Sequence, residues 1–268
     1  MTTVVAVAVN AFRESVRDRV LYVLVVFAVV LIAMSVLIGQ LTAGQDIKII
    51  KDFGLAAISL IGLLVAVFIG VGLVWKEVER RSIYSLLAKP IRRTHFVLGK
   101  FCGLSLTLLV MVAIMTATYF IVLAWLGSTF PPEARVAWPR PAVDPLLLKA
   151  IGLLTMELLL VTAIALFFST FSSPFLSIVL TLAMWVIGTL SADLRNADTF
   201  LDSGMAIALL NSLYYVVPNM AAFDVKMQVV HGLEVPWTYI ATTLLYGVVY
   251  TAFVLTGAVL IFQRREFR

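Results

Sequence analysis

The feature that most constrains this chain is the length of its apolar stretches without a charge. Phe53–Trp75 holds 23 residues and Phe101–Gly127 holds 27, and neither contains Asp, Glu, Lys or Arg. A helix needs about 20 apolar residues to cross the roughly 30 Å hydrocarbon layer of a bilayer. The other stretches of comparable length are Val20–Leu41, Ala150–Phe171, Pro174–Ala192 and Trp237–Phe262. The sequence therefore predicts an all-α integral membrane protein with six transmembrane helices.

Composition supports the same fold class. The 268 residues are 62% hydrophobic and 13% charged, whereas soluble domains are about 45–50% apolar and about a quarter charged. Backbone groups in lipid must be hydrogen-bonded within the protein, which favours helices. The stretches do not alternate polar and apolar residues as barrel strands do. Because no internal repeat is visible, residues 1–268 are interpreted as one membrane domain.

The basic residues predict the orientation. Six spans place both termini on one side, and that side carries 13 of the 20 Lys and Arg residues, against 7 on the other. The excess of Lys and Arg marks the cytoplasmic side. The net charge of +5 therefore reflects membrane orientation, and no nucleic-acid partner is predicted.

Two further segments are predicted to lie at the membrane surfaces. In residues 4–19, an apolar stripe at helical spacing indicates an amphipathic helix in the cytoplasmic interface; the stripe is Val5, Val9, Phe12 and Val16. The alternative is a simple extension of the first span. On the outer side, Met205–Val217 is apolar but too short to span, which indicates a re-entrant or interfacial helix between spans five and six.

The loop between spans two and three holds seven of the twenty basic residues. Its apolar residues Ile83, Leu86 and Leu87 share one helical face, and Pro90 ends the helix predicted there. A loop that only fixes topology or binds lipid headgroups needs only Lys and Arg. Because Glu77 and Glu79 are interleaved with the basic residues, the mixture suits docking against another protein.

The segment KEVERRSIYSLLAKPIRRTHFVLGK, residues 76–100, resembles the cytoplasmic loop of ABC-2 type transporter permeases. Those loops begin with an acidic-x-acidic-basic pattern and continue with Ser or Thr, a Leu-Leu pair, Pro, a basic residue and Gly-Lys. The matching residues are Glu77, Glu79, Arg80, Ser82, Leu86, Leu87, Pro90, Arg93, Gly99 and Lys100. The six spans and the short connection between spans four and five extend the resemblance over the whole chain. Within the family, the chain is most similar to permeases of copper-enzyme maturation, of the kind that serve nitrous oxide reductase.

The resemblance implies an exporter subunit in a bacterial inner membrane. The loop is then a coupling helix in a cleft of a separate ATPase subunit, with Glu77, Glu79, Arg80 and Arg81 as polar contacts and Leu86 and Leu87 as apolar ones. Ser82, Pro90 and Arg93 belong to the same set of residues that contact the ATPase. Two permease copies, identical or paralogous, pair with two ATPase subunits, which bind ATP and Mg²⁺. No cofactor is expected in this chain, because it contains no phosphate-binding G-x-x-x-x-G-K-[ST] loop. The expected partners are the ATPase, a second permease, lipid and a periplasmic protein.

A few residues inside the spans have two interpretations each. Glu157 lies near the middle of span four, where a charge costs about 3 kcal/mol on insertion scales. It either faces the translocation path or dimer interface, or is protonated or hydrogen-bonded to Thr155, Thr162 or a neighbouring span. Gly62 and Gly70 lie on a small-residue face that either packs closely within the chain or lines the dimer seam or the pathway. Trp185 and Gly188 in span five line the path if the chain follows the family.

Three other functions fit the sequence less well or stay open. An intramembrane protease needs His and Glu converging within the membrane, and no predicted span contains His. A secondary transporter usually shows broken helices or paired charges at the midplane, whereas only Glu157 is present. A permease that transmits ATP-driven motion to a periplasmic partner without transport stays open. No metal site is predicted, because the outer cluster Asp193, Asp198 and Asp202 has neither His nor Cys nearby.

Overall fold

The computed structural model describes residues 3–40, 46–79, 93–130, 138, 140–191 and 217–264, and within these ranges all regular structure is helical. The long helices are α2 (Arg19–Gln40), α3 (Asp46–Glu79), α5 (Arg93–Thr129), α7 (Leu146–Ser169) and α12 (Trp237–Arg264). The shorter elements are α1 (Thr3–Val16), α8 (Pro174–Thr189), η2 (Ala221–Phe223) and α11 (Lys226–Val230). The predicted all-α fold class is therefore confirmed.

Five of these helices, α2, α3, α5, α7 and α12, are long and apolar enough to cross a membrane. The fifth predicted span, Pro174–Ala192, is helical over the 16 residues of α8. Sixteen residues rise about 24 Å, which is less than the roughly 30 Å of hydrocarbon in a typical bilayer. The structure thus shows a multi-pass membrane protein, and the crossing of the membrane by α8 remains a prediction.

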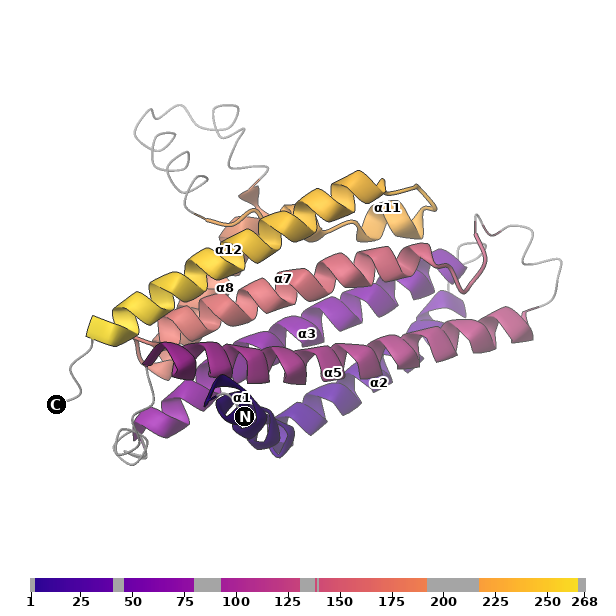
Figure 1. Cartoon of the computed structure of the whole chain (residues 1–268). Helices are drawn as coiled ribbons and strands as arrows, with labels where there is room; N and C mark the ends of the chain where they lie inside the picture. The colour runs from indigo at the N-terminus through magenta and orange to yellow at the C-terminus, as the bar shows by residue number, and fades with distance from the viewer. Residues whose placement is uncertain are drawn as a thin grey trace, which may run out of the picture.

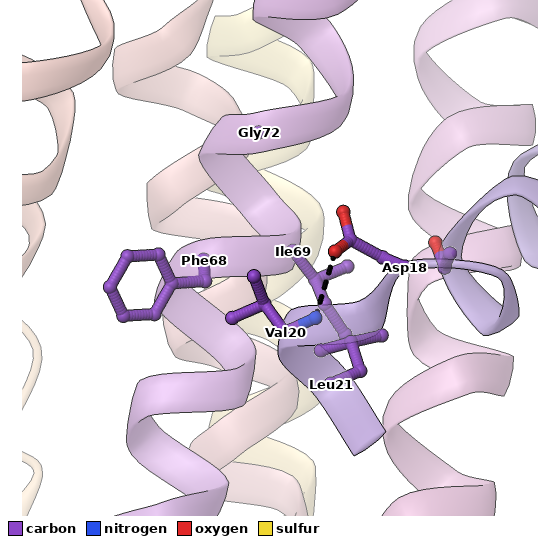
Figure 2. Close-up of a pocket in the computed structure, with 7 residues that line it drawn as sticks. Asp18, Val20, Leu21, Phe68, Ile69 and Gly72 are labelled. Atoms are coloured by element: carbon purple, nitrogen blue, oxygen red, sulfur yellow. Dashed lines mark hydrogen bonds between the residues drawn. The ribbon is translucent and has the colours of Figure 1, made fainter. Parts of the chain in front are cut away.

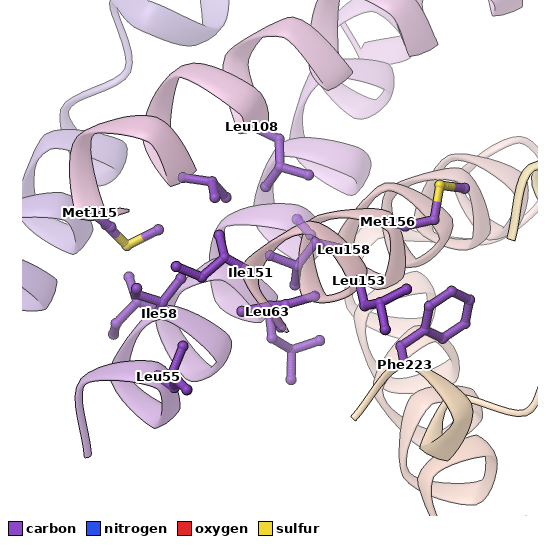
Figure 3. Packing of buried hydrophobic residues seen from close by; sticks show 14 of the residues in the cluster. Leu55, Ile58, Leu63, Leu108, Met115, Ile151, Leu153, Met156, Leu158 and Phe223 are labelled. Atoms are coloured by element: carbon purple, nitrogen blue, oxygen red, sulfur yellow. The ribbon is translucent and has the colours of Figure 1, made fainter. Parts of the chain in front are cut away.

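The long helices form one elongated bundle, and α1 and the last turn of α12 lie toward the same end of it (Figure 1). Helices α3 and α7 are mostly buried inside the bundle, whereas α2 and α12 present much of their apolar surface outward. The core is built where α3, α5 and α7 meet, with Phe223 of η2 at its edge (Figure 3). The bundle thus has two central helices, of which α7 carries Glu157.

Helices α3 and α5 are both longer than the predicted spans. Helix α3 continues without a break past Trp75 to Glu79, and α5 begins at Arg93 rather than Phe101. Their 34 and 37 residues correspond to about 51 and 55 Å, because each residue of an α-helix rises 1.5 Å. The predicted separate helix after span two is therefore continuous with α3 as far as Glu79, and its remainder lies outside the described residues.

The N-terminal segment forms a separate helix, as predicted, because the chain turns at Arg17 and Asp18 before α2 begins. Asp18 Oδ1 accepts a hydrogen bond from the backbone N–H of Val20 at 3.1 Å, which caps the start of α2. The side of α1 buried in the protein carries Ala11 and Ser15. Val5, from the predicted apolar stripe, is 43% exposed. The predicted apolar stripe is therefore not the side of α1 that is buried in the protein; Val9, Phe12 and Val16 are half-buried.

The tight connection between the fourth and fifth apolar segments is confirmed. Ser173 is the N-cap residue of α8 and Pro174 is its first residue, where the missing N–H of proline costs no hydrogen bond. The Ser173 side chain makes no capping hydrogen bond. Instead, the hydroxyl of Ser172 donates to the carbonyl of Phe168 at 2.9 Å and lies 2.7 Å from that of Ser177.

Candidate functional site

The first candidate site is the segment between α3 and α5, where sequence analysis placed the contacts with a partner. Glu77 and Glu79 lie in the last turns of α3, but the side chains of residues 73–79 lie outside the described part of the structure. Residues 80–92, which include Arg80, Arg81, Ser82, Leu86, Leu87 and Pro90, lie outside it entirely. The structure therefore fixes the two helices that carry the segment and leaves these contacts as predictions.

Arg93 is the one residue of the predicted contact set whose side chain is described. It is the first residue of α5, and its Nη1 donates hydrogen bonds to the carbonyl oxygens of Phe262 and Gln263, at 3.0 and 2.9 Å. These carbonyls belong to the last turn of α12, where the helix offers no backbone N–H to them. Arg93 thus binds another helix of the same chain.

Gly99 and Lys100, the last two residues of the loop motif, lie in the second turn of α5 and join it to α1. A Cβ at Gly99 would lie 2.7 Å from the Cβ of Val7, so α1 packs directly on the glycine. Gly103 makes an equally close approach, to the carbonyl oxygen of Ala8. The side chain of Lys100 is 1% exposed, and its Nζ lies 3.9 Å from Oε2 of Glu14. Helix α1 is therefore attached to the part of α5 that follows the segment.

The second candidate site is the buried carboxyl of Glu157, at the middle of α7. Trp185 Nε1 donates a hydrogen bond to Glu157 Oε1 at 2.8 Å, and Glu157 is 6% exposed. The hydroxyls of Thr155 and Thr162 donate to carbonyls of their own helix, Ile151 and Leu158. The structure thus selects a neighbouring helix, α8, among the hydrogen-bond partners that sequence analysis left open. Trp185 and Glu157, predicted separately, form one polar contact.

Gly62 and Gly70 both lie on the contact between α3 and α7. A Cβ at Gly62 would come within 2.5 Å of Leu158 Cδ1, and a Cβ at Gly70 within 2.5 Å of the Cβ of Ala165. Small residues allow helix backbones to approach closely in membranes, where dispersion drives association. Of the two interpretations of these glycines, the structure supports packing within the chain.

Gly188 lies where the outer segment packs against the end of α8. A Cβ there would lie 2.5 Å from the carbonyl oxygen of Pro218, and the N–H of Met220 donates to the Gly188 carbonyl at 3.0 Å. The N–H of Asn219 donates to the hydroxyl of Tyr246 at 2.9 Å. Tyr246 is nine residues from the start of α12, which corresponds to about 14 Å along the helix.

Residues 217–223 therefore lie alongside α8 and α12, within the length of the bundle. Met220 and Phe223 are buried there, and Lys226 of α11 reaches Ser59 of α3 with its Nζ 3.3 Å from the hydroxyl. The predicted helix Met205–Val217 lies outside the described residues except for Val217.

Replacement of Tyr246 by phenylalanine is expected to weaken the packing of residues 217–223 against α8 and α12, which we call the cap. The change leaves the N–H of Asn219 without its acceptor, and an unpaired buried donor costs about 1–3 kcal/mol. We expect a lower midpoint of thermal unfolding in detergent, measured by size-exclusion chromatography after heating. Tyr22→Phe is the matched control, because Tyr22 is 53% exposed on α2. An unchanged midpoint for Tyr246→Phe would show that this hydrogen bond does not hold the cap.

Two cavities lie next to these contacts. A cavity of about 760 Å³ lies between α7, α8 and α12, and its walls are almost wholly apolar; they include Phe167, Phe168, Met184, Tyr250 and Phe253. A smaller one, about 150 Å³, lies where the α1–α2 turn meets α3, with Asp18 and Gly72 at its rim (Figure 2). Ligand pockets usually measure about 300–1,000 Å³, so only the first has that size.

Several residues that join the elements were not singled out by sequence analysis. Examples are Tyr246, Asn219 and Lys226. Each makes a hydrogen bond that involves a backbone group or a hydroxyl on a distant element, and the sequence does not reveal such a partner. Within the described residues, no three His, Cys, Asp or Glu side chains come together as a metal site would require. The cluster Asp193, Asp198 and Asp202 lies outside these residues.

A comparison with known protein families matches the model described as an ABC-2 family transporter protein to residues 5–267. The chain belongs to this ABC-2 transporter family. A search of curated protein sequences found no match. The predicted family is thus confirmed, and this ABC-2 protein is a membrane permease component of an ABC transporter. Permeases of this family are not themselves catalytic and normally work with an ATPase subunit.

Proposed function

We propose that this ABC-2 permease is an exporter subunit, driven by a separate ATPase that docks on residues 76–92. The observation that carries the proposal is the pair of helices α3 and α5. Both are continuous, both are about 20 Å longer than the roughly 30 Å hydrocarbon layer of a bilayer, and they meet the segment from its two sides. A force applied to the segment is therefore delivered to two continuous helices at once.

The chemistry of the sequence agrees with this division of labour. The chain has no phosphate-binding loop, so ATP and Mg²⁺ belong to the partner in this proposal. The 13 basic residues on the side of the termini favour a cytoplasmic position for the segment. Glu77, Glu79, Arg80 and Arg81 provide both charge signs for a protein surface, and Leu86 and Leu87 provide its apolar contact.

The proposed assembly is a bacterial inner-membrane complex of two permease copies and two ATPase subunits, with lipid around the exposed helices. Helices α2 and α12 offer broad apolar surfaces for these contacts. In this proposal, the contact between Glu157 and Trp185 borders the path of the substrate, because it is a buried polar contact that lies between two membrane helices. A role in the maturation of copper enzymes is part of the same proposal and rests on the resemblance of the loop.

A second function is favoured by one observation, the close packing of residues 217–230 against the bundle, where residues 217–223 contact α8 and α12 and α11 contacts α3 and α7. Through these contacts, ATP-driven motion of the helices reaches the outer face, where a periplasmic protein receives it without any transport. Sealed vesicles that contain the complex distinguish the two functions. Flux of a candidate substrate that depends on ATP supports export, whereas hydrolysis without flux supports transmission.

The double substitution Glu77→Lys and Glu79→Lys is expected to detach the ATPase. In the proposed complex, Glu77 and Glu79 face positive charges of the ATPase. Their reversal to lysine brings like charges together, which costs several kcal/mol of binding free energy. The measurement is the amount of ATPase that co-purifies with the tagged chain in mild detergent. We expect a stoichiometric ATPase with the unsubstituted chain and at least about a tenfold loss with the double variant, which corresponds to about 1.4 kcal/mol.

The matched control is Glu234→Lys, a charge reversal at the opposite end of the bundle, which should retain the ATPase. Glu234 is 81% exposed in its ion pair with Arg140, so its reversal should not disturb the fold. If the double variant retains the ATPase and its activity, the segment serves topology alone, and the proposal is wrong.

A further inference from the structure

The first turn of α5 is attached to the last turn of α12, 169 residues further along the chain. Besides the two hydrogen bonds of Arg93, the side-chain amide of Gln263 donates to the hydroxyl of Thr94 at 3.2 Å. The rings of Phe96 and Phe262 are stacked with centroids 5.6 Å apart and an angle of 12° between their planes. Three residues of α5 therefore contact the same two residues of α12.

Arginine suits this position for a physical reason. The last carbonyls of a helix lack intrahelical donors and carry the negative end of the helix dipole. A guanidinium is always charged and offers several donors in a fixed plane, so one side chain can bind two carbonyls. Hydrogen bonds from a charged donor are stronger than those from a neutral one, so a neutral side chain would hold these carbonyls less firmly.

The attached end of α12 belongs to the wall of the larger cavity. Leu260 and Ile261, which directly precede Phe262, line this cavity together with α7 and α8. One turn further into α12, a Cβ at Gly257 would lie 3.2 Å from the ring of Phe167 on α7, so the two helices touch there. A displacement of the last turn of α12 therefore changes the width of the cavity between α7, α8 and α12.

We propose that Arg93 is a positioning residue that makes α12 move with the docking segment, residues 76–92, which we also call the coupling segment. This movement opens and closes the apolar cavity between α7, α8 and α12. The inference rests on the proposed function, since the ATPase supplies the motion. Arg93 follows residues 76–92 directly, so a displacement of that segment moves α5 through the chain and α12 through the guanidinium. Arg93 then acts inside the permease, whereas family resemblance alone would place it against the ATPase.

The test replaces the natural attachment by a chemical one. In a Cys102→Ser background, Arg93→Ala is combined with Thr94→Cys and Gln263→Cys, whose parent side chains touch. A short bis-methanethiosulfonate reagent then joins the two thiols, and a reducing agent separates them again. ATP hydrolysis is measured on the complex purified through a tag on this chain, and Arg13→Ala, a change to an exposed arginine on α1, is the control.

Arg93→Ala is expected to reduce hydrolysis at least fivefold, the cross-link to restore most of it, and reduction to abolish the restoration. A variant that stays inactive although the cross-link has formed would show that Arg93 acts on the ATPase directly, which overturns the proposal. Unchanged hydrolysis in Arg93→Ala would overturn it too. The control should behave as the unsubstituted chain.

Hydrogen exchange of residues 258–264 separates this proposal from the proposed function. Without Arg93 the last turn of α12 should fray, and its amides should exchange about tenfold faster; Arg93→Lys should give an intermediate rate. If no ATPase accompanies the unsubstituted chain, the proposed function is wrong, yet exchange still reports whether Arg93 holds α12. Unchanged exchange in Arg93→Ala overturns the attachment itself.

Discussion

Replacement of Gly70 by leucine is expected to prevent the chain from accumulating as a folded protein. The Cβ of the new side chain would lie 2.5 Å from the Cβ of Ala165 and 3.3 Å from the carbonyl oxygen of Thr162. Neither atom can move aside alone, because one is fixed to the backbone of α7 and the other is part of it. Overpacking of a core costs about 1–3 kcal/mol, occasionally more, and we expect the upper end of this range.

Gly72→Leu is the matched control for this prediction. Gly72 lies two residues further along α3, and a Cβ there meets no atom within 4 Å, because it borders the small cavity between α3 and the α1–α2 turn (Figure 2). Leucine also favours a helix over glycine by up to about 1 kcal/mol. Fluorescence-detected size-exclusion chromatography should show a monodisperse peak for Gly72→Leu and aggregation for Gly70→Leu. Equal behaviour of the two variants would contradict the close contact of α3 with α7.

The comparison of Gly70 with Gly72 shows what a single sequence leaves undetermined. Both glycines lie in the same uncharged stretch, and only the position of α7 makes one essential and the other replaceable. The small-residue spacing of Gly62 and Gly70 predicted close packing but offered two partners, the pathway and another helix. The choice between them depends on Leu158 and Ala165, almost a hundred residues away.

Apolar length predicted the bundle well because it measures the bilayer directly. It did not predict where helices end, since a helix continues into water when its residues are good helix formers. For this reason α3 extends to Glu79 and α5 starts at Arg93, although hydropathy ends the spans at Trp75 and Phe101. Residues 76–79 of α3 lie within the proposed docking segment and residues 93–100 of α5 follow it, so hydropathy alone missed the helix ends on which the proposed function depends.

Contacts that involve backbone groups were beyond sequence reasoning for a different reason. Arg93 binds the carbonyls of Phe262 and Gln263, and any residue type offers such a carbonyl. Tyr246 likewise accepts from the backbone of Asn219. The loop motif identified Arg93 as important through family resemblance, but its partner follows from the arrangement of α5 and α12.

The contact between Glu157 and Trp185 predicts a measurable coupling between α7 and α8. Trp185→Phe keeps an aromatic ring but removes the indole N–H that donates to Oε1 of Glu157. A buried polar group that loses its partner costs about 1–3 kcal/mol. We therefore expect Trp185→Phe to lower the unfolding midpoint in detergent, and Glu157→Gln to lower it less, because the amide oxygen of glutamine still accepts from Trp185.

A double-mutant cycle isolates the hydrogen bond from the loss of packing. Once Glu157 is replaced by leucine, Trp185→Phe no longer leaves a buried carboxyl without its donor. The double variant should therefore lose less free energy of unfolding than the sum of the two single variants. The expected coupling is about 1–3 kcal/mol, in the range found for residues in direct contact. Additive effects would mean that α7 and α8 are held by apolar packing alone. In that case Glu157 would not stabilise the contact with α8. A function in the translocation path would then explain why a carboxyl lies at the middle of a buried membrane helix.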